Sequence, residues 1–273
     1  MKKRLYLAVL ICFFLGTDLR AQQDEQMSIY MFNQLYLNPA YAGSRDVLSA
    51  IAVARFQWVS FEGAPTTQWF SLHAPLKQKS LGIGTHLVND RIGSRTRTAA
   101  YLDLSGSIAL NSKTSRLSAG ISGGIDVVGY DFSSVVVNDL NDPYYGTSYS
   151  ETKPNLGAGL YYYSDNHFVS LSTPRLLESK ISNDSLNRKL NSRHFFLSGG
   201  YVFKMNSVFK LKPTVLIKYT PNAPITIDVN ASILMYEKLW AGIMYRFHEA
   251  MGVNIVYNIK EMFSAGYVYD FPI

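Results

Sequence analysis

The chain has 273 residues, with 26 lysines and arginines against 20 aspartates and glutamates. Residues 1–21 are predicted to be a secretory signal peptide, because three basic residues, Lys2, Lys3 and Arg4, precede an apolar run and Ala21 offers a small residue for cleavage. The apolar run is too short to cross a bilayer as a helix. Without this segment, 22 basic and 19 acidic residues remain, a balance that gives no case for nucleic-acid binding.

The only cysteine, Cys12, lies inside the predicted signal peptide. The mature chain is therefore expected to have no disulfide, no catalytic thiol and no cysteine metal site. No stretch after residue 21 is apolar enough for a membrane-spanning helix. Aromatic residues make up 14% of the chain, 19 of them tyrosine, and charged residues only 17%. This composition fits a transmembrane β-barrel, and it also fits a soluble β-sandwich.

Residues 22–47 are predicted to be a periplasmic lead-in that holds a tight turn. Asn38 precedes Pro39, which disfavours helical backbone at Asn38, and its side chain can close an Asx turn. Gly43 offers a position where positive φ carries no penalty, just before strand-forming residues begin. A first strand follows, and a second turn is expected at residues 61–65.

Apolar and polar residues alternate over most of the remaining chain, residues 48–273, and this pattern predicts half-buried strands. In residues 117–127, for example, Ile125 is expected on the lipid face and Asp126 on the polar face. Strands of about ten residues are long enough to cross the membrane while tilted, which favours a transmembrane barrel over a soluble one. Thirteen segments are predicted to start near Leu48, Thr66, Leu81, Thr96, Arg116, Asn155, His167, Arg193, Phe209, Ile225, Leu239, Met251 and Met262.

The connections between these segments fall into two alternating sets, as in outer-membrane barrels. Short turns form one set, and the other includes two long loops at residues 131–153 and 174–192. With a periplasmic lead-in, the thirteenth strand would run outward. Single-chain bacterial barrels normally have an even number of strands, so fourteen are expected and the barrel is predicted to lack its last strand.

Three sequence blocks also resemble a known family. MFNQLYLNPAYAGSR, ARFQW and FEGAPTT, in this order, are similar to the N-terminal signature of the PorP/SprF family, and weaker similarity extends through most of the chain. The resemblance implies an outer-membrane β-barrel of type IX secretion and gliding in Bacteroidetes. Turn formation, barrel closure near the N-terminus and partner contact are the roles expected of the matching residues. They are Asn38, Pro39, Ala40, Tyr41, Ala42, Gly43, Arg55, Gln57, Trp58, Phe61, Glu62, Gly63 and Pro65.

By the same resemblance, the protein is expected to help export or anchor a surface adhesin, or to associate with periplasmic ring components. No catalysis and no cofactor are implied. The alternative is a passive porin-like channel, and an outer-membrane hydrolase is a third possibility. In the channel, charged residues would line a wet interior: Asp103, Asp126, Asp228, Lys210, Lys212 and Lys218.

The candidate sites for other chemistry are weak. The five histidines lie on different strands or their ends, without the spacing of a zinc site. No G-x-S-x-G motif opens a helix, so nothing singles out a nucleophile. Gly82-x-Gly84 and Gly157-x-Gly159 sit inside strands, where glycine more often lets the wall curve or a side chain pass close. Oxygen ligands in residues 138–143 could hold calcium, but the EF-hand glycine and glutamate are missing.

Overall fold

The computed structural model describes residues 27–77, 80–110, 114–133, 146–180, 189–221, 223–260 and 262–273. The predicted signal peptide and the possible calcium loop at residues 138–143 lie outside these residues. Almost all regular structure is β-strand, and two short helical turns precede the first strand: α2 (Gln34–Leu37) and the 3-10 turn η1 (Pro39–Tyr41). No helix of the described residues is long and apolar enough to cross a membrane.

The strands of the first half are long and follow one another directly. They are β1 (Ser49–Phe56), β2 (Thr66–Pro75), β3 (Leu81–Ile92), β4 (Arg95–Ala109), β5 (Arg116–Asp131), β6 (Ser148–Tyr163) and β7 (His167–Thr173). The second half contains β8 (Ser179–Lys180), β9 (Lys189–Asn191), β10 (Phe195–Tyr201), β11 (Phe203–Lys204), β12 (Phe209–Tyr219), β13 (Thr226–Met235), β14 (Leu239–Arg246), β15 (Ala250–Lys260) and β16 (Phe263–Pro272).

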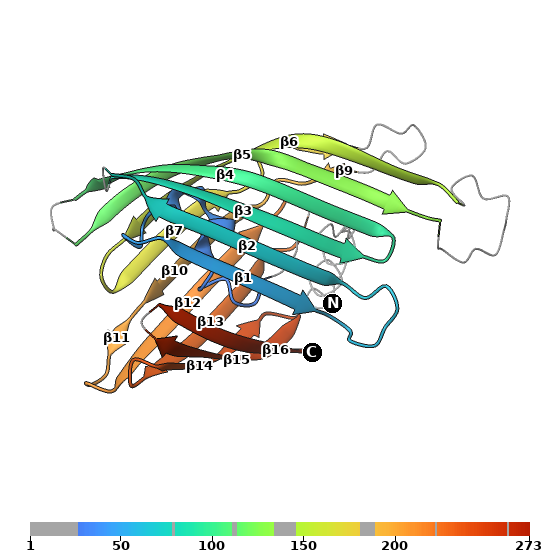
Figure 1. Ribbon diagram of the computed structural model, residues 1–273. Coiled ribbons are helices and arrows are strands. Elements are labelled where there is room, and N and C mark those ends of the chain that lie inside the picture. Colours follow the sequence, from blue (N-terminus) through green and yellow to red (C-terminus); the bar gives the residue numbers. More distant parts are fainter. Residues whose placement is uncertain are drawn as a thin grey trace, which may run out of the picture.

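These strands form one 14-stranded antiparallel sheet, and β8 and β9 pair separately. Each strand pairs with its neighbours in the chain, in the order β1-β2-β3-β4-β5-β6-β7-β10-β12-β13-β14-β15-β16. Strand β11 continues β10 after Val202 and also pairs with β12. The sheet curves around an interior, as a barrel wall does (Figure 1). The predicted fold class, an all-β antiparallel wall, is confirmed.

The predicted strand starts agree with the structure within two residues, except for one. Strand β6 begins at Ser148, whereas the sequence predicted a start near Asn155. Residues 148–154 pair with the end of β5, and Lys153 lies opposite Asp126. Polar residues and Pro154 hid this part of the strand, because they interrupt the alternation. The loop predicted at 131–153 is therefore shorter, and the β5–β6 hairpin extends beyond its neighbours (Figure 1).

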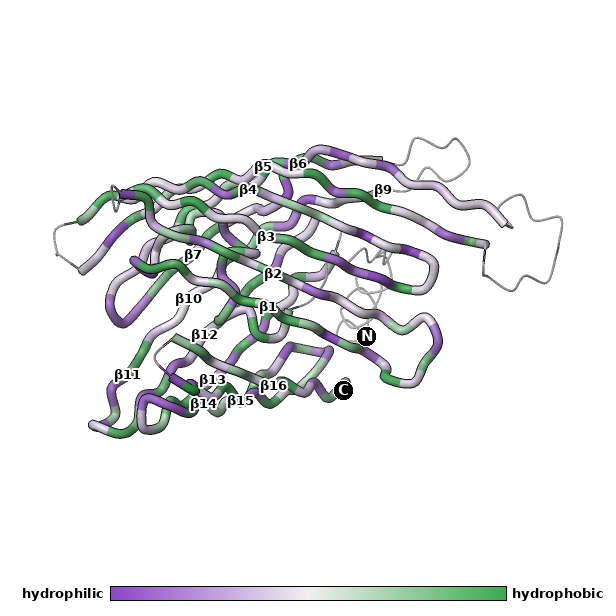
Figure 2. The backbone as a smooth tube through the Cα atoms, in the orientation of Figure 1, coloured by the Kyte–Doolittle hydropathy of each residue, from purple (hydrophilic) through white to green (hydrophobic). Residues whose placement is uncertain are grey.

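The two faces of the sheet carry the residues that the alternation predicts. On β5, Ile125 has an exposed fraction of 47% on the outer face, and Asp126 is fully buried on the inner face. Hydrophobic and hydrophilic residues alternate in the same way along most strands (Figure 2). A wall with exposed leucines and isoleucines outside and serines, asparagines and aspartates inside is the pattern of a barrel that faces lipid.

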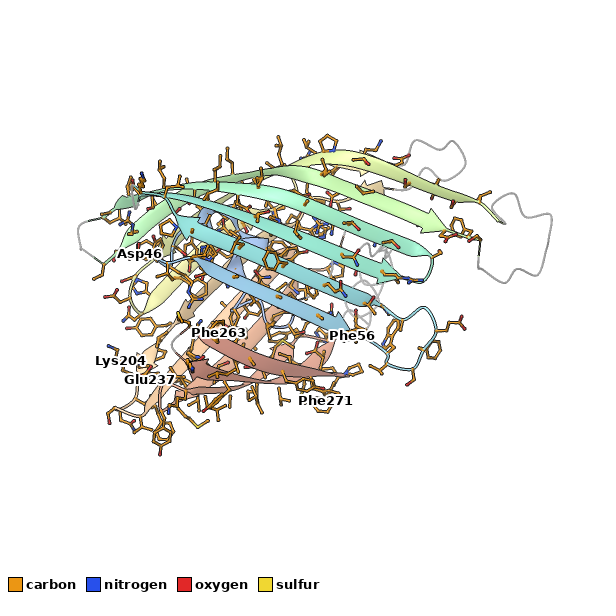
Figure 3. All side chains as sticks on the ribbon, viewed as in Figure 1. Asp46, Phe56, Lys204, Glu237, Phe263 and Phe271 are labelled. Carbon is orange, nitrogen blue, oxygen red and sulfur yellow. The ribbon has the colours of Figure 1, made fainter. Side chains whose placement is uncertain are left out.

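Strands β1 and β16 are the two ends of the sheet order formed by the described residues. They run in the same direction, β1 toward Phe56 and β16 from Phe263 toward Phe271 (Figure 3). The expected fourteenth wall strand stays a prediction.

Two buried aspartates of the inner face, Asp126 and Asp228, are paired with basic side chains. The Asp126 carboxylate accepts hydrogen bonds from Arg97 Nε at 2.9 Å and from the Tyr101 hydroxyl at 2.6 Å. Asp228 lies 3.0 Å from Arg246 Nε and 2.9 Å from Lys218 Nζ. Because these charges are buried, removing one partner leaves the other without its compensating charge, at a cost of about 3–5 kcal/mol.

This pairing changes what substitutions on the two faces of β5 should do. From the faces alone, Asp126→Leu would be tolerated better than Ile125→Asp. The structure contradicts that ranking, because leucine removes the carboxylate that binds Arg97 and Tyr101. We expect each substitution to lower the free energy of unfolding by roughly 2–5 kcal/mol. Both variants should therefore lose heat-modifiable migration on gels.

The double variant Arg97→Met/Asp126→Leu serves as the control, since it removes both charges. It should recover part of the folded fraction. Wild-type assembly of Asp126→Leu alone would show that the ion pair contributes little.

Candidate functional site

The three sequence blocks singled out above occupy three different places in the structure. Residues 38–43 lie inside the curved sheet, Arg55 lies near the end of β1, and residues 57–65 form the exposed loop between β1 and β2. The sequence predicted residues 22–47 as a periplasmic lead-in. Of its described part, residues 27–47, residues 27–43 pack along the inner face of the sheet (blue in Figure 1), and we call them the interior segment.

Asn38 shapes the turn at the end of the interior segment. Its Oδ1 accepts a hydrogen bond from the backbone N–H of Ala40 at 2.8 Å, which is the predicted Asx turn. Pro39 then starts η1, and the N–H of Ala42 donates to the carbonyl of Pro39 at 3.1 Å. Gly43 follows with a φ of 71°, as the sequence predicted, and directs the chain toward β1.

Hydrogen bonds join this turn to the wall, and side chains of both take part. The Asn38 Nδ2 donates to the carbonyl of Leu160 and to Ser170 Oγ, both at 2.8 Å. The Ser172 hydroxyl donates to the carbonyl of Leu37 at 2.6 Å, and the Ser105 hydroxyl to that of Ala42 at 2.7 Å. The contacts therefore reach β4, β6 and β7, and they satisfy polar groups of the turn that would otherwise be buried alone.

Three glycines of the wall make room for the turn. A Cβ at Gly82 would overlap the carbonyl of Ala42, one at Gly120 the backbone of Ala40, and one at Gly159 the side chain of Asn38. These glycines lie on β3, β5 and β6, so the turn sits against three strands. The interpretation of Gly82 and Gly159 as positions of close approach is confirmed, and the neighbour turns out to be the chain's own N-terminal part.

Aromatic rings hold the interior segment before the turn, at Tyr36, and within it, at Tyr41. The Tyr36 ring lies edge-on to Trp69 and His86, with centroids 6.2 and 6.0 Å apart. The Tyr41 ring packs edge-on against Tyr161 at 5.3 Å. Rings with these separations and angles contribute about 0.5–1.5 kcal/mol per pair beyond the area they bury.

The first half of the interior segment contacts the opposite wall. The Tyr30 hydroxyl lies 3.1 Å from Thr214 Oγ1 on β12. Phe32 packs edge-on against Trp240 on β14, and the ammonium of Lys212 lies 5.8 Å from the centroid of each of these rings. The segment thus contacts strands from both halves of the sheet.

The loop of residues 57–65 presents apolar side chains outward. Trp58 and Phe61 have exposed fractions of 67% and 78%. The loop is held in one shape, because the N–H of Gln57 donates to the carbonyl of Pro65 at 3.0 Å and the N–H of Gly93 to that of Gly63 at 2.9 Å. Trp58 itself has a positive φ of 47°, a conformation that a bulky residue rarely adopts.

Most of the residues proposed to line a wet channel do not line an open interior in the described chain. Asp103, Asp126 and Asp228 are fully buried and paired, Lys218 pairs with Asp228, and Lys212 lies beside Phe32 and Trp240. Lys210 lies near the β13–β14 turn, 2.5 Å from Glu237.

A hydrolase site was the third alternative. His86 Nδ1 lies 2.8 Å from Asp103, which resembles part of a catalytic triad. Both side chains are buried under the interior segment, and His86 stacks on Tyr101 with a centroid distance of 4.8 Å. No hydrogen bond found among the described residues joins His86 to a serine. No three acidic, histidine or cysteine residues of the described chain are grouped to hold a metal.

The comparison with protein families decides the relationship. A family profile described as "Type IX secretion system membrane protein PorP/SprF" matches residues 19–273. The chain belongs to the PorP/SprF family. The resemblance inferred from the three sequence blocks is thereby confirmed, and the chain is a membrane protein of type IX secretion.

Other comparisons add little to this PorP/SprF assignment. A search of curated proteins returned no match. One solved structure, described as "Unveiling the Mechanism Behind the in-meso Crystallization of Membrane Proteins", is similar over 82% of this chain and 84% of its own. It shares 13% sequence identity and has a TM-score of 0.42, a level that carries no argument about function.

Sequence reasoning missed the partners of the PorP/SprF motif. Alternation along single strands could not show that Ser105 and Ser172 bind the backbone of the interior segment. The glycines were the available signal, since Gly82, Gly120 and Gly159 all fall on inner faces where a bulky neighbour must approach.

The close contact between the turn and the wall can be tested by substituting two glycines of β5. We expect Gly120→Val to displace the turn, because the new side chain would overlap the backbone of Pro39 and Ala40. Overpacking of this kind costs about 1–3 kcal/mol. The midpoint of heat-modifiable migration should fall accordingly.

Gly123→Val on the same strand is the matched control. A Cβ at Gly123 meets only Leu156 Cδ2 at 3.6 Å, which is an ordinary contact. Equal effects of the two substitutions would contradict the close approach of the turn.

Proposed function

We propose that this protein is a non-enzymatic component of the type IX secretion and gliding machinery, exported by a signal peptide to the outer membrane of a Bacteroidetes cell. There it would help export or anchor a surface adhesin, or connect to periplasmic ring components. Membership of the PorP/SprF family supports the secretion role. The apolar outer face of the sheet supports residence in a membrane.

The main observation that favours this proposal over a passive channel is that the interior segment lies inside the sheet. The interior segment contacts both halves of the sheet and is bound by side chains and backbone of the wall. Asp126 and Asp228 on the inner face are buried in ion pairs, whereas an open porin keeps a polar, water-filled channel. A barrel built in this way suits a docking or anchoring part better than a diffusion pore.

Bilayer conductance separates these two functions. The purified barrel should give no steady open-pore current, because the interior segment lies inside the sheet and contacts both of its halves. A variant without residues 27–37 should show current if the segment is what blocks conduction. A steady current from the unaltered chain would favour the porin-like alternative, and hydrolysis of lipid substrates by the same sample would favour the hydrolase.

We propose the loop of residues 57–65 as a partner-contact surface. Unlike residues 38–43, it does not pack into the interior, and its exposed Trp58 and Phe61 are large residues of the kind enriched at protein interfaces. A girdle at the membrane interface is the other interpretation of these aromatics. The two interpretations differ in whether a protein partner depends on them.

Co-purification tests this loop. Trp58→Ser/Phe61→Ser should keep heat-modifiable migration but lose most of the secreted proteins that co-purify with the wild type. Loss of a hot-spot aromatic typically weakens binding by about 2 kcal/mol or more.

Leu48→Ser is the control, since Leu48 is exposed by 70% and precedes β1 at the opposite end of the strand. If both variants retain the same co-purifying proteins, the loop acts as a membrane girdle.

A further inference from the structure

The outer face of β2, β3 and β4 changes from apolar to polar before these strands reach the loop of residues 57–65. Outward-facing residues that lie side by side on neighbouring strands form rows across the sheet. One row, from β1 to β5, is apolar: Ala52, Phe70, Leu87, Ala100 and Ile125. The next two rows on β2, β3 and β4 are polar: Gln68, Asn89 and Thr98, and then Thr66, Arg91 and Thr96. We call these six residues the polar step.

The polar step is confined to this part of the wall. In the second half of the sheet, an outer row close to the same end of the barrel is hydrophobic: Val215, Val229, Tyr245, Met251 and Phe271. On β3, by contrast, residues 89–91 are hydrophilic (Figure 2). Polar side chains in hydrocarbon lose their contacts with water, at a cost in free energy. The exposed side chains of Gln68, Asn89 and Thr98 therefore favour water, or a polar partner, over lipid at this place.

The polar step adjoins the exposed loop of residues 57–65. The N–H of Gly93, in the turn between β3 and β4, donates to the carbonyl of Gly63 at 2.9 Å. Thr66 lies four residues beyond Phe70 on β2. Four residues span about 13 Å along a strand, of which a tilt of about 45° leaves about 9 Å along the membrane normal. The headgroup layer is only about 5–8 Å thick, so the loop stands beyond it if lipid ends at the first polar row.

We propose that the lipid boundary on this side of the barrel runs along Gln68, Asn89 and Thr98, and that the polar step and the loop form one surface above the membrane for a protein partner. Trp58 and Phe61 supply exposed apolar anchors. The amides and hydroxyls of the step and the guanidinium of Arg91 supply hydrogen-bond donors. This chemistry fits a protein segment that presents apolar side chains beside carbonyl or carboxylate acceptors. The partner rests on the proposed function of the loop, whereas the boundary does not.

Fluorescence quenching in lipid vesicles tests the boundary in the full chain. Cys12→Ser removes the only cysteine, and Thr98→Cys or Leu102→Cys then carries a dye on the outer face of β4. Leu102 lies two rows deeper than Thr98 and is exposed by 66%. Phosphatidylcholine with brominated acyl chains quenches dyes within the hydrocarbon. We expect quenching at position 102 to exceed that at position 98 by about threefold, because half of the hydrocarbon layer is only about 15 Å thick.

Gln68→Cys and Leu72→Cys repeat this comparison on β2. Gln68 lies in the same row as Thr98, and Leu72 in the same row as Leu102. This pair decides the result if a variant of β4 does not assemble. Equal quenching at the two depths would place the step in lipid and overturn the proposal.

Co-purification tests whether the step belongs to the partner surface. Asn89→Leu/Arg91→Leu should keep heat-modifiable migration, because both side chains lie on the outer face of β3. The recovery of secreted proteins that co-purify with the wild type should fall by about tenfold. Ile83→Ala/Leu87→Ala is the matched control, since it changes two exposed residues of the same strand and face within the apolar band. It should retain these proteins.

The outcomes separate the surface from the proposed function of the loop. If the step variant retains proteins that Trp58→Ser/Phe61→Ser loses, the step is not part of the surface, and this proposal fails while the function of the loop stands. If neither variant loses a protein, the proposed function of the loop fails as well. An equal loss in the control would show a general disturbance of the wall and contradict a specific surface.

Discussion

The structure depends on the close approach of one backbone turn to the wall that surrounds it. At residues 38–43 the chain presses against β3, β5 and β6, at positions where any side chain larger than hydrogen would overlap it. Serine hydroxyls then bind the carbonyls that this approach buries. Without the glycines the turn could not reach the wall, and without the serines its buried carbonyls would cost about 1–3 kcal/mol each.

The paired charges of the inner face follow from the same occupied interior. A carboxylate beside water can stay solvated, but Asp126 and Asp228 lie behind the interior segment and the side chains around it. Arginine suits these positions because its planar group binds a carboxylate through several N–H donors. At Asp126 and Asp228 the polar face is therefore buried rather than open to water, which single-strand alternation does not distinguish.

The strands could be predicted well because the alternation of apolar and polar residues is visible within each strand alone. Residues such as Ile125 and Asp126 take their face from a period of two that needs no knowledge of neighbours. The Asx turn and the positive φ of Gly43 are equally local. The placement of residues 27–43 could not be predicted from the sequence. It depends on contacts such as that of Asn38 with Leu160, which lies more than a hundred positions away. Strand β6 was shortened because Pro154 interrupts its pattern.

The two sets of contacts made by the interior segment have a consequence for how the protein folds. The turn binds β3 to β7, which come earlier in the chain, whereas residues 28–32 bind β12, β14 and β16, which come later. The early contacts close shorter loops and carry a lower entropic cost. The first half of the sheet can therefore form on the segment as a template, and the later strands are then recruited to its other side. Assembly of the wall would proceed around a core that is already in place.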